Sequence, residues 1–454
     1  MNTNQCKLIL AICILLLGLS AAVAHPTGQY EAGKVIDSVI CKADPTQSYA
    51  LYVPSKGSAN ALPIIYFFDP HGSGALPLNK YRSLAETYGF ILAGSNNSKN
   101  GNDWSLTERI WQQLSADTKM RLKIDGSRIY TCGFSGGAKV AGYVAMQHPE
   151  IKGVIAGGAG LPDEVQADNF NFCFTVIAGE GDMNLTELVA ISRELDKTRT
   201  RHHILFFDGK HEWAPVSTME TAFAGLQLDA MQKALVRKDN TFIDHFAGKG
   251  KNRVGTYSQS SQLIKAEQEC QVFISYLDGL TPAVDWFKTK ANSLERNPSF
   301  LQQREGQENL LMYEQNTKLG YMQHFQQGDP HYWRPVISDL QTKSESTTAS
   351  GLMDQRLLAY LSLAFYSLSN RLIISNSNTD ARRFVELYKM ADPTNSEAWY
   401  FSALLSARAG QVRAAEHDLL KAAEYGFRDM NRLRQQPEFQ SLDLSGVGGK
   451  MHGR

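Results

Sequence analysis

Residues 133–137 read Gly-Phe-Ser-Gly-Gly, and the first half of the chain is best understood outward from this stretch. The apolar, strand-type run 128–132 (RIYTC) precedes it, and the helix-type run 138–146 (AKVAGYVAM) follows it. A strand, a sharp turn and then a helix form the context in which a G-x-S-x-G sequence exposes a nucleophilic serine. Ser135 is therefore the candidate nucleophile, with an ordinary helix N-cap as the alternative.

The glycines around Ser135 have a steric explanation. The serine of such a turn has a strained backbone, and side chains two positions before and after it would collide. Gly133 and Gly137 occupy these two positions. The helix that begins behind Ser135 contributes its positive end, and the amide of Gly136 would face a developing oxyanion.

Composition excludes several classes of partner. The chain has 454 residues, with 46 Lys and Arg against 46 Asp and Glu, so its formal net charge is zero. A nucleic acid or an anionic membrane would call for a basic excess, so neither is expected as a partner. Length and a hydrophobic content of 43% predict two or three domains with real cores.

The first 24 residues are predicted to be a secretory signal peptide. Lys7 precedes the apolar run 8–19, and Ala22-Val23-Ala24 is an A-x-A cleavage site. The run is shorter than the ~20 residues that a membrane-spanning helix needs. No later stretch is expected to span a membrane, so the sequence predicts an exported protein, periplasmic or secreted, without a span after signal cleavage.

The cysteines outside the signal do not form a metal or redox motif. Cys41, Cys132, Cys173 and Cys270 include no C-x-x-C pair. Cys132 and Cys173 lie in apolar strand-type runs, where they are expected to be buried packing residues. A Cys41–Cys270 disulfide is an alternative in an oxidising compartment.

Residues 25–240 alternate between strand-type and helix-type segments. Such alternation predicts a mostly parallel sheet with helices on both faces. The strand-type runs are 49–53, 62–68, 90–93, 128–132, 153–156, 173–178 and 203–207, and the helix-type runs are 76–88, 106–120, 138–146, 185–195 and 219–235.

Two strand ends supply the groups that a nucleophilic serine needs. The strand-type run 174–178 leads into Asp182, and the run 204–207 leads into His211. An imidazole must take the serine proton, and a carboxylate must orient the imidazole and stabilise its cation. The order serine, acid, histidine is the one expected of this fold class. Glu180 and Asp208 remain alternatives to Asp182 as the acid.

A further strand end offers the second oxyanion donor. The run 64–68 ends in residues 69–74 (DPHGSG), where the amide of Ser73 is the first candidate and that of Gly72 the second. No H-E-x-x-H motif or His/Asp cluster at ligand spacing is present, so no metal is expected.

Two tryptophans are candidates for contacts with the substrate. Trp104 follows the polar loop 95–101, which is expected to border the site, and Trp213 lies beside the candidate histidine. Trp213 would form an aromatic wall for an acyl or aryl group. Packing in the core is the alternative for both side chains.

Residues 41 to about 235 resemble the α/β-hydrolase superfamily, and in particular exported esterases similar to polyhydroxybutyrate depolymerases, feruloyl esterases and acetylxylan esterases. The motifs that carry the resemblance are FFDPHGSG (67–74), GFSGG (133–137), GEGD (179–182) and GKHEW (209–213). The resemblance implies a serine esterase without cofactor, acting on a small or polymer-linked ester. It implies nucleophile Ser135, acid Asp182, base His211, and oxyanion amides at Ser73 and Gly136.

Two other functions are left open by the sequence. A peptidase or amidase of the same fold would use the same three side chains. A binding protein, in which a decayed hydrolase supports helical repeats, belongs to a different class.

The second half of the chain is predicted to be helical. Residues 241–350 are expected to be a helical connecting region, with a long helix at 298–327 that Gly328-Asp329-Pro330 stops. Residues 351–441 resemble tetratricopeptide repeats, because Ala381 and Ala415 are 34 residues apart. Such repeats would bind a protein partner or cap the hydrolase. Residues 442–454 are expected to be a flexible tail.

Overall fold

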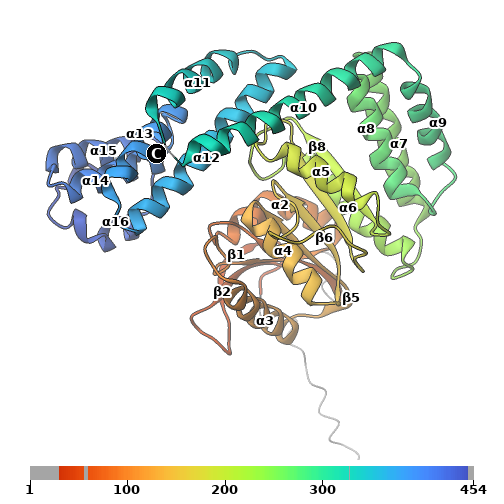
Figure 1. The fold of residues 1–454 in the computed structure, drawn as a ribbon. Helices are drawn as coiled ribbons and strands as arrows, with labels where there is room; N and C mark the ends of the chain where they lie inside the picture. Colours follow the sequence, from red (N-terminus) through yellow and green to blue (C-terminus); the bar gives the residue numbers. More distant parts are fainter. Residues whose placement is uncertain (1–29, 56–59, 327, 448–454) are drawn as a thin grey trace, which may run out of the picture.

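The computed structural model describes residues 30–55, 60–326 and 328–447. The predicted signal peptide, 1–24, lies outside the described residues, so its prediction stays a prediction. A sheet flanked by helices forms the first part of the chain, and helices alone form the second part (Figure 1).

One sheet of eight strands organises the first part of the described chain, in the order β1-β2-β4-β3-β5-β6-β7-β8. The pairs β1–β2 and β2–β4 are antiparallel, and the other neighbours are parallel. The strands are β1 (Val35–Ile40), β2 (Ser48–Tyr52), β3 (Leu62–Phe68), β4 (Ile91–Ser95), β5 (Ile124–Phe134), β6 (Ile151–Gly157), β7 (Cys173–Gly179) and β8 (His202–Phe207).

Helices cover both faces of this sheet. Successive residues of a strand point to opposite faces, so Ile65 and Phe67 of β3 join one apolar cluster while Ile64 and Tyr66 join the other. The first cluster includes α2 (Ala75–Tyr88) and α6 (Val216–Gln232), and the second includes α3 (Trp104–Arg121), α4 (Gly136–Gln147) and α5 (Leu185–Leu195). The predicted fold class, an α/β-hydrolase sheet followed by an all-α region, is confirmed.

Strand β1 is the one element of the sheet that the sequence pattern did not reveal. It lies at the sheet edge and pairs with β2 alone. Asp37 and Ser38 interrupt its apolar residues and are exposed. An edge strand with polar residues lacks the continuous apolar run that marked the buried parallel strands.

The apolar core of the sheet extends beyond the predicted domain boundary at residue 240. Helices α7 (Asn240–Gln259), α8 (Leu263–Leu277) and α9 (Val284–Glu295) share one cluster with α2 and α6, and this cluster reaches Phe300. The first part of the predicted connecting region therefore packs as a layer of the hydrolase half. Its helices carry many polar residues, so their docking surface was not evident from composition.

A buried polar cluster fixes α8 against the edge strand β8. The ring of His203 stacks on Tyr276 at 3.6 Å between centroids, and His203 Nε2 lies 3.2 Å from Asp229 Oδ2. Burial lowers the pKa of His203 below its usual range, against the opposing effect of Asp229. Burial would raise the pKa of Asp229, but His203 and Arg201, whose Nε is 2.5 Å from the carboxylate, lower it.

The remaining helices build a separate apolar core. Phe365, Phe384 and Phe401 are buried within it. The long helix predicted from Pro298 is present and ends close to Gly328. The helices are α10 (Pro298–Phe325), α11 (Pro330–Lys343), α12 (Ala349–Ile374), α13 (Asn378–Ala391), α14 (Ser396–Arg408), α15 (Val412–Glu424) and α16 (Met430–Gln435), followed by the short 3-10 turn η1 (Pro437–Phe439).

The described part of the predicted tail is packed. Val447 is buried, and Leu442 and Leu444 contact the helical core. Residues 442–447 thus differ from the expected flexible tail, because their apolar side chains at 442, 444 and 447 have a surface to cover. Residues 448–454 lie outside the described part.

Helix α12 corrects one expectation about membranes. Its 26 residues are long and apolar enough to cross a membrane by length and composition, whereas no such stretch was expected beyond the signal. In the structure α12 contributes Leu357, Leu361 and Phe365 to the helical core. It also carries the buried charges Asp354 and Arg356.

The four cysteines of the described chain are free and buried. The alternative Cys41–Cys270 disulfide is therefore absent. Cys41 lies in the cluster with α3 to α5, and Cys270 lies in the cluster on the opposite face of the sheet. Burial raises the pKa of the Cys41 thiol to about 11 and that of Cys270 to about 12, which makes both thiols unreactive.

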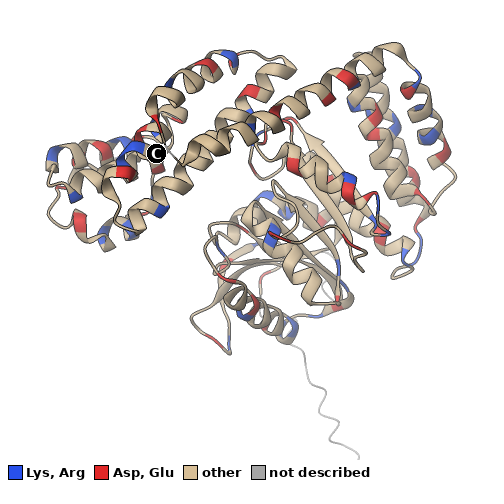
Figure 2. Cartoon of the chain, viewed as in Figure 1, with Lys and Arg blue, Asp and Glu red and all other residues tan. Residues whose placement is uncertain are grey.

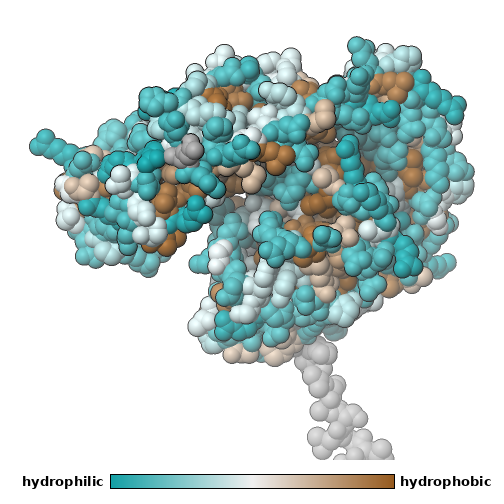
Figure 3. Space-filling model, in the orientation of Figure 1, coloured by the Kyte–Doolittle hydropathy of each residue, from teal (hydrophilic) through white to brown (hydrophobic). Residues whose placement is uncertain are grey.

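Charges of both signs are mixed along the described chain. Lys and Arg alternate with Asp and Glu along the helices (Figure 2), in keeping with the net charge of zero. The face in Figure 3 is mainly hydrophilic with small apolar patches, and a notch separates the C-terminal helical lobe from the sheet.

Candidate active site

Ser135 lies at the turn between β5 and α4 in a strained conformation. Its φ is 54° and its ψ is −126°, which are unfavourable values for a residue with a side chain. A Cβ at Gly133 would lie 2.0 Å from the carbonyl oxygen of Gly137, and a Cβ at Gly137 would lie 1.9 Å from that of Phe68. The flanking glycines are thus required by the backbone, as the sequence indicated.

Ser135, His211 and Asp182 are joined by hydrogen bonds. His211 Nε2 lies 2.9 Å from Ser135 Oγ, and His211 Nδ1 lies 3.0 Å from both carboxylate oxygens of Asp182. An ionised carboxylate only accepts, so Nδ1 carries the proton and donates it, and Nε2 accepts from the hydroxyl. The Asp182 side chain is 1% exposed and that of His211 is 21% exposed. Neither Glu180 nor Asp208, the alternative acids, has a hydrogen bond to His211 within the described residues.

The loop that follows β7 holds the Asp182 carboxylate toward the imidazole. The amide of Asn184 donates to Asp182 Oδ1 at 2.8 Å, and the Asn184 side chain donates to the carbonyl of Gly158 at 2.8 Å. The amide of Gly181 donates to the carbonyl of Gly209 at 2.8 Å. These bonds connect the acid loop, defined here as residues 179–184, with β6 and with the loop that carries the histidine.

Gly158 lies directly against the Asp182–His211 pair. Its φ is +67°, and a Cβ there would come within 2.6 Å of Phe134, 3.1 Å of His211 Cε1 and 3.2 Å of Asp182 Oδ2. A side chain at this position would push on the ring that backs His211, because Phe134 and His211 lie 4.7 Å apart between centroids. The absence of a side chain at Gly158 therefore makes room for the imidazole.

The amide of Gly136 is placed for an anion at Ser135. Gly136 is the first residue of α4, so its N–H belongs to the helix turn that has no intrahelical acceptor, at the positive end of the helix dipole. The second predicted donor, the amide of Ser73, lies 3.4 Å from Asp69 Oδ1, near the limit for a hydrogen bond. The amide of Gly72 closes a turn onto the carbonyl of Asp69 at 3.1 Å.

Asp69 organises the 69–74 loop. Its carboxylate accepts from the amide of His71 at 2.9 Å and from Trp213 Nε1 at 2.9 Å. Burial would raise the pKa of Asp69, but the bonds from His71, Trp213 and the loop amides hold it below its usual range. Its side chain is 4% exposed, so the loop is arranged around a buried anion.

His71 lies on the exposed side of this loop. Its side chain is 82% exposed, and Nδ1 lies 3.6 Å from Asp69 Oδ1. The hydrogen bond to the Asp69 carboxylate raises the pKa of His71. Burial opposes this increase with a smaller effect, and the negative charges of Asp69 and of Glu397 on α14 add to the increase.

The two tryptophans have different environments. Trp213 is buried in the core, 5.6 Å from Phe134 and 6.1 Å from Phe67 between centroids, which is the packing alternative. Trp104 is 41% exposed and stacks on Tyr143 at 4.5 Å. Trp104 thus keeps a surface available to a ligand, whereas Trp213 acts on the site through Asp69.

The polar loop 95–101 borders the serine, as expected from the sequence. A Cβ on Gly136 would lie 1.9 Å from Asn100 Oδ1, so the Asn100 side chain covers the residue after the serine. The backbone amide of Asn100 donates to the carbonyl of Pro70, and the backbones of Lys99 and His71 pair in an isolated antiparallel β-bridge. These contacts connect the loop with residues 69–74 on the other side of the site.

Four residues of the site were not singled out in the sequence: Asp69, Asn100, Gly158 and Asn184. An aspartate whose carboxylate accepts amides two and four positions later is a local turn pattern, so Asp69 could have been found in the DPHGSG segment. The carboxylate of Asp182 likewise accepts from the amide of Asn184, two positions later. Gly158 acts through contacts distant in sequence, for which one sequence holds no signal. Asn100 belongs to the loop 95–101 that was expected beside the site, but its contact with Gly136 was not predicted.

Comparisons with known proteins place no family on this chain. No protein-family model matches it, and no curated protein sequence matches it. Solved structures of similar fold include a hyperthermophilic esterase from the archaeon Pyrobaculum calidifontis, with 13% identity and a TM-score of 0.35 over 52% of this chain and 94% of that one. An S-formylglutathione hydrolase from Agrobacterium tumefaciens has 17% identity and a TM-score of 0.35 over 43% and 93%.

A third similar structure is the S-formylglutathione hydrolase FrmB from Staphylococcus aureus. It has 10% identity and a TM-score of 0.36, over 43% of this chain and 98% of that one. The TM-scores of these three structures are below 0.5, so the likeness carries no argument about this chain. The first part of this chain has the α/β-hydrolase fold, with a helical region after it.

Proposed function

We propose that this protein is an exported serine hydrolase that cleaves carboxylic esters. The observation that carries the proposal is the hydrogen-bonded series from Asp182 through His211 to Ser135. The three side chains come from three strand ends of one sheet, and each has the partner that its role requires. Export is supported by the sequence of residues 1–24.

The proposed reaction proceeds through an acyl-enzyme. Ser135 Oγ attacks the acyl carbon as its proton passes to His211 Nε2, and the amides of Gly136 and Ser73 hold the oxyanion. The bond to the leaving alcohol breaks as the imidazolium returns the proton to the alcohol oxygen. Water then attacks the acyl carbon, again giving its proton to His211, and the acid leaves as Ser135 recovers its hydrogen.

The surroundings of the serine favour an open site. Ser135 and His211 are partly exposed. The ring of Trp104, which follows the loop 95–101 in the sequence, is also exposed. A polymer-linked ester suits such a surface as well as a small ester does.

The substrate class is tested with an ester and amide panel. The chain without residues 1–24 is expected to hydrolyse p-nitrophenyl acetate, and Ser135→Ala is expected to lower kcat at least about 10³-fold, because the nucleophile is lost. Equal turnover by both proteins would end the proposal. Faster cleavage of peptide anilides than of matched esters would instead favour a peptidase. No turnover of any substrate, together with capture of a defined protein partner, would favour a binding protein.

A further inference from the structure

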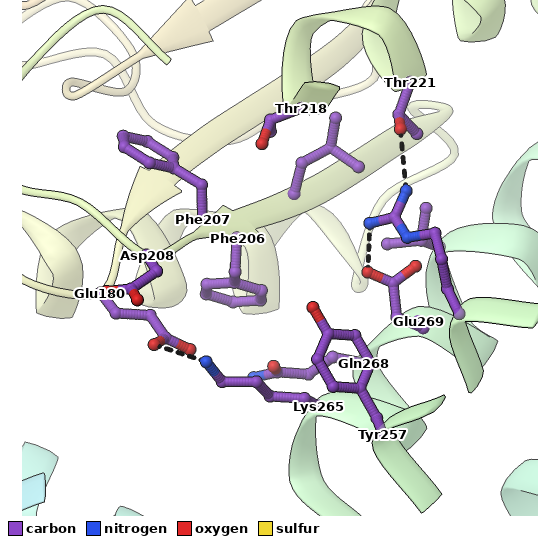
Figure 4. Close-up of a pocket in the computed structure, with 13 residues that line it drawn as sticks. Glu180, Phe206, Phe207, Asp208, Thr218, Thr221, Tyr257, Lys265, Gln268 and Glu269 are labelled. Carbon is purple, nitrogen blue, oxygen red and sulfur yellow. Dashed lines mark hydrogen bonds and ion pairs between the residues drawn. The ribbon is translucent and has the colours of Figure 1, made fainter. Parts of the chain in front are cut away.

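Three cationic side chains from three different helices converge on the acid loop. Arg356 of α12 donates to the carbonyl of Glu180 at 2.8 Å, and Lys318 of α10 donates to the carbonyl of Met183 at 2.7 Å. Lys265 of α8 lies 2.9 Å from Glu180 Oε2, and Figure 4 shows this pair among the side chains that line a small cavity of about 70 Å³. In the sequence, Asp182 lies between Glu180 and Met183, whose carbonyls accept from Arg356 and Lys318.

A buried glutamate aims two of these cations. Glu314 of α10 has no exposed side-chain surface. One carboxylate oxygen accepts from Arg356 Nε at 2.9 Å and Nη2 at 2.6 Å, and the other accepts from Lys318 at 2.6 Å. A buried ion cluster costs desolvation energy and stabilises a fold weakly. What it does supply is fixed geometry, since each cation has few alternative positions.

The cations contact the acid loop beside a large cavity. A cavity of about 650 Å³ lies between the loop and the helices, bordered by Glu180, Leu185, Leu310, Leu352 and Arg356. Apolar side chains therefore do not fill the space on this side. Beside this cavity, Arg356 and Lys318 reach the loop by hydrogen bonds to its carbonyls, and Lys265 reaches it through its ion pair with Glu180.

We propose that the helical region positions the acid of the site, with Arg356 and Lys318 as positioning residues held by Glu314. This inference rests on the proposed function for its catalytic consequence only. Bonds to Gly209 and Gly158 fix the inner side of the acid loop, and the two cations fix its outer side. Together they keep the Asp182 carboxylate within hydrogen-bond distance of His211.

The helical lobe thereby becomes part of the hydrolase machinery. Residues beyond 300 contribute no group that touches the substrate in this account. They act through main-chain carbonyls on both sides of Asp182. A hydrolase half cut off at residue 240 would keep Ser135, Asp182 and His211 and lose both cations.

The test compares three variants of the full mature chain. Lys318→Met removes the bond to Met183 while Arg356 still pairs with Glu314 through two bonds, so the buried carboxylate keeps a partner. Lys318→Arg restores a cation. Lys389→Met is the matched control, because Lys389 is a similarly buried lysine of the helical lobe, 18% against 12% exposed, that pairs with Glu386 away from the loop.

Amide hydrogen exchange measures the position of the loop without using activity. In Lys318→Met, amides of residues 180–185 are expected to exchange about tenfold faster, because one charge-assisted hydrogen bond is lost. Lys389→Met should leave these amides unchanged, and Lys318→Arg should restore most of their protection. Equal exchange of the loop in Lys318→Met and in the unchanged protein would overturn the inference.

Ester turnover measures the catalytic consequence. We expect Lys318→Met to lower kcat about 10- to 100-fold with KM nearly unchanged, because a displaced carboxylate orients the imidazole poorly while the substrate surface is intact. Recovery in Lys318→Arg would support positioning, and wild-type kcat in Lys318→Met would contradict it. A protein inactive even when unchanged would refute the proposed function, while the exchange data would still decide the inference.

Discussion

Asp182→Asn is expected to lower kcat by about 10⁴-fold while the protein remains folded. The asparagine side chain fits the same space and can still accept a bond from Asn184. It removes the negative charge that stabilises the imidazolium and permits the tautomer in which Nε2 holds the proton. In that tautomer Nε2 cannot accept the proton of Ser135. Steady-state kinetics on an activated ester, with circular dichroism to check folding, measures the effect.

Asp208→Asn is the control for this substitution. Asp208 follows β8 three residues before His211, was an alternative acid in the sequence, and is exposed. Its loss of charge is expected to change kcat by less than about twofold, as for a surface residue. A larger loss of kcat in Asp208→Asn than in Asp182→Asn would show that the acid is Asp208, after β8, and would contradict the assignment of Asp182.

Gly158→Ala is expected to lower kcat at least about 10²-fold, since misplacement by about 1 Å has effects of this size. The added methyl would lie 2.6 Å from Phe134 and 3.1 Å from His211. It would also place a side chain at a φ of +67°, which costs roughly 1–2 kcal/mol. The ring of Phe134 must move, and the imidazole that it backs must move with it. Activity and the melting temperature are measured together.

The neighbouring glycine provides the matched control. A Cβ at Gly157 would have ordinary contacts, 3.6 Å from Gly133 and 3.8 Å from Phe134, and Gly157 has no positive φ. Gly157→Ala is therefore expected to retain most of the activity. Full activity in Gly158→Ala, or an equal loss in both variants, would show that the methyl does not disturb His211.

The sequence alone was informative wherever a local pattern determines a local structure. The alternation of apolar runs and helix-type segments predicted the parallel strands, because a strand buried on both faces must be continuously apolar. The glycines around Ser135 predicted its strained turn. The positions of Asp182 and His211 after strand ends predicted that they would lie at one edge of the sheet, and their hydrogen bonds now join them to Ser135.

Long-range packing was the part that one sequence could not predict. Helices α7 to α9 dock on the sheet through contacts such as Tyr276 on His203, which no periodicity reveals. Arg356 binds the carbonyl of Glu180 across 176 positions of the chain. The sequence left open whether Trp213 faces a substrate or packs in the core, and the structure shows its indole buried and bound to Asp69.

The most direct measurement of the central claim is the site of covalent labelling by a fluorophosphonate, mapped by mass spectrometry on the mature chain. We predict one phosphonyl adduct on Ser135, formed rapidly in the unchanged protein, slowly in His211→Ala, and absent in Ser135→Ala. Rapid labelling that does not depend on His211, an adduct on another serine, or no adduct at all would contradict the claim that Asp182, His211 and Ser135 act together as an esterase.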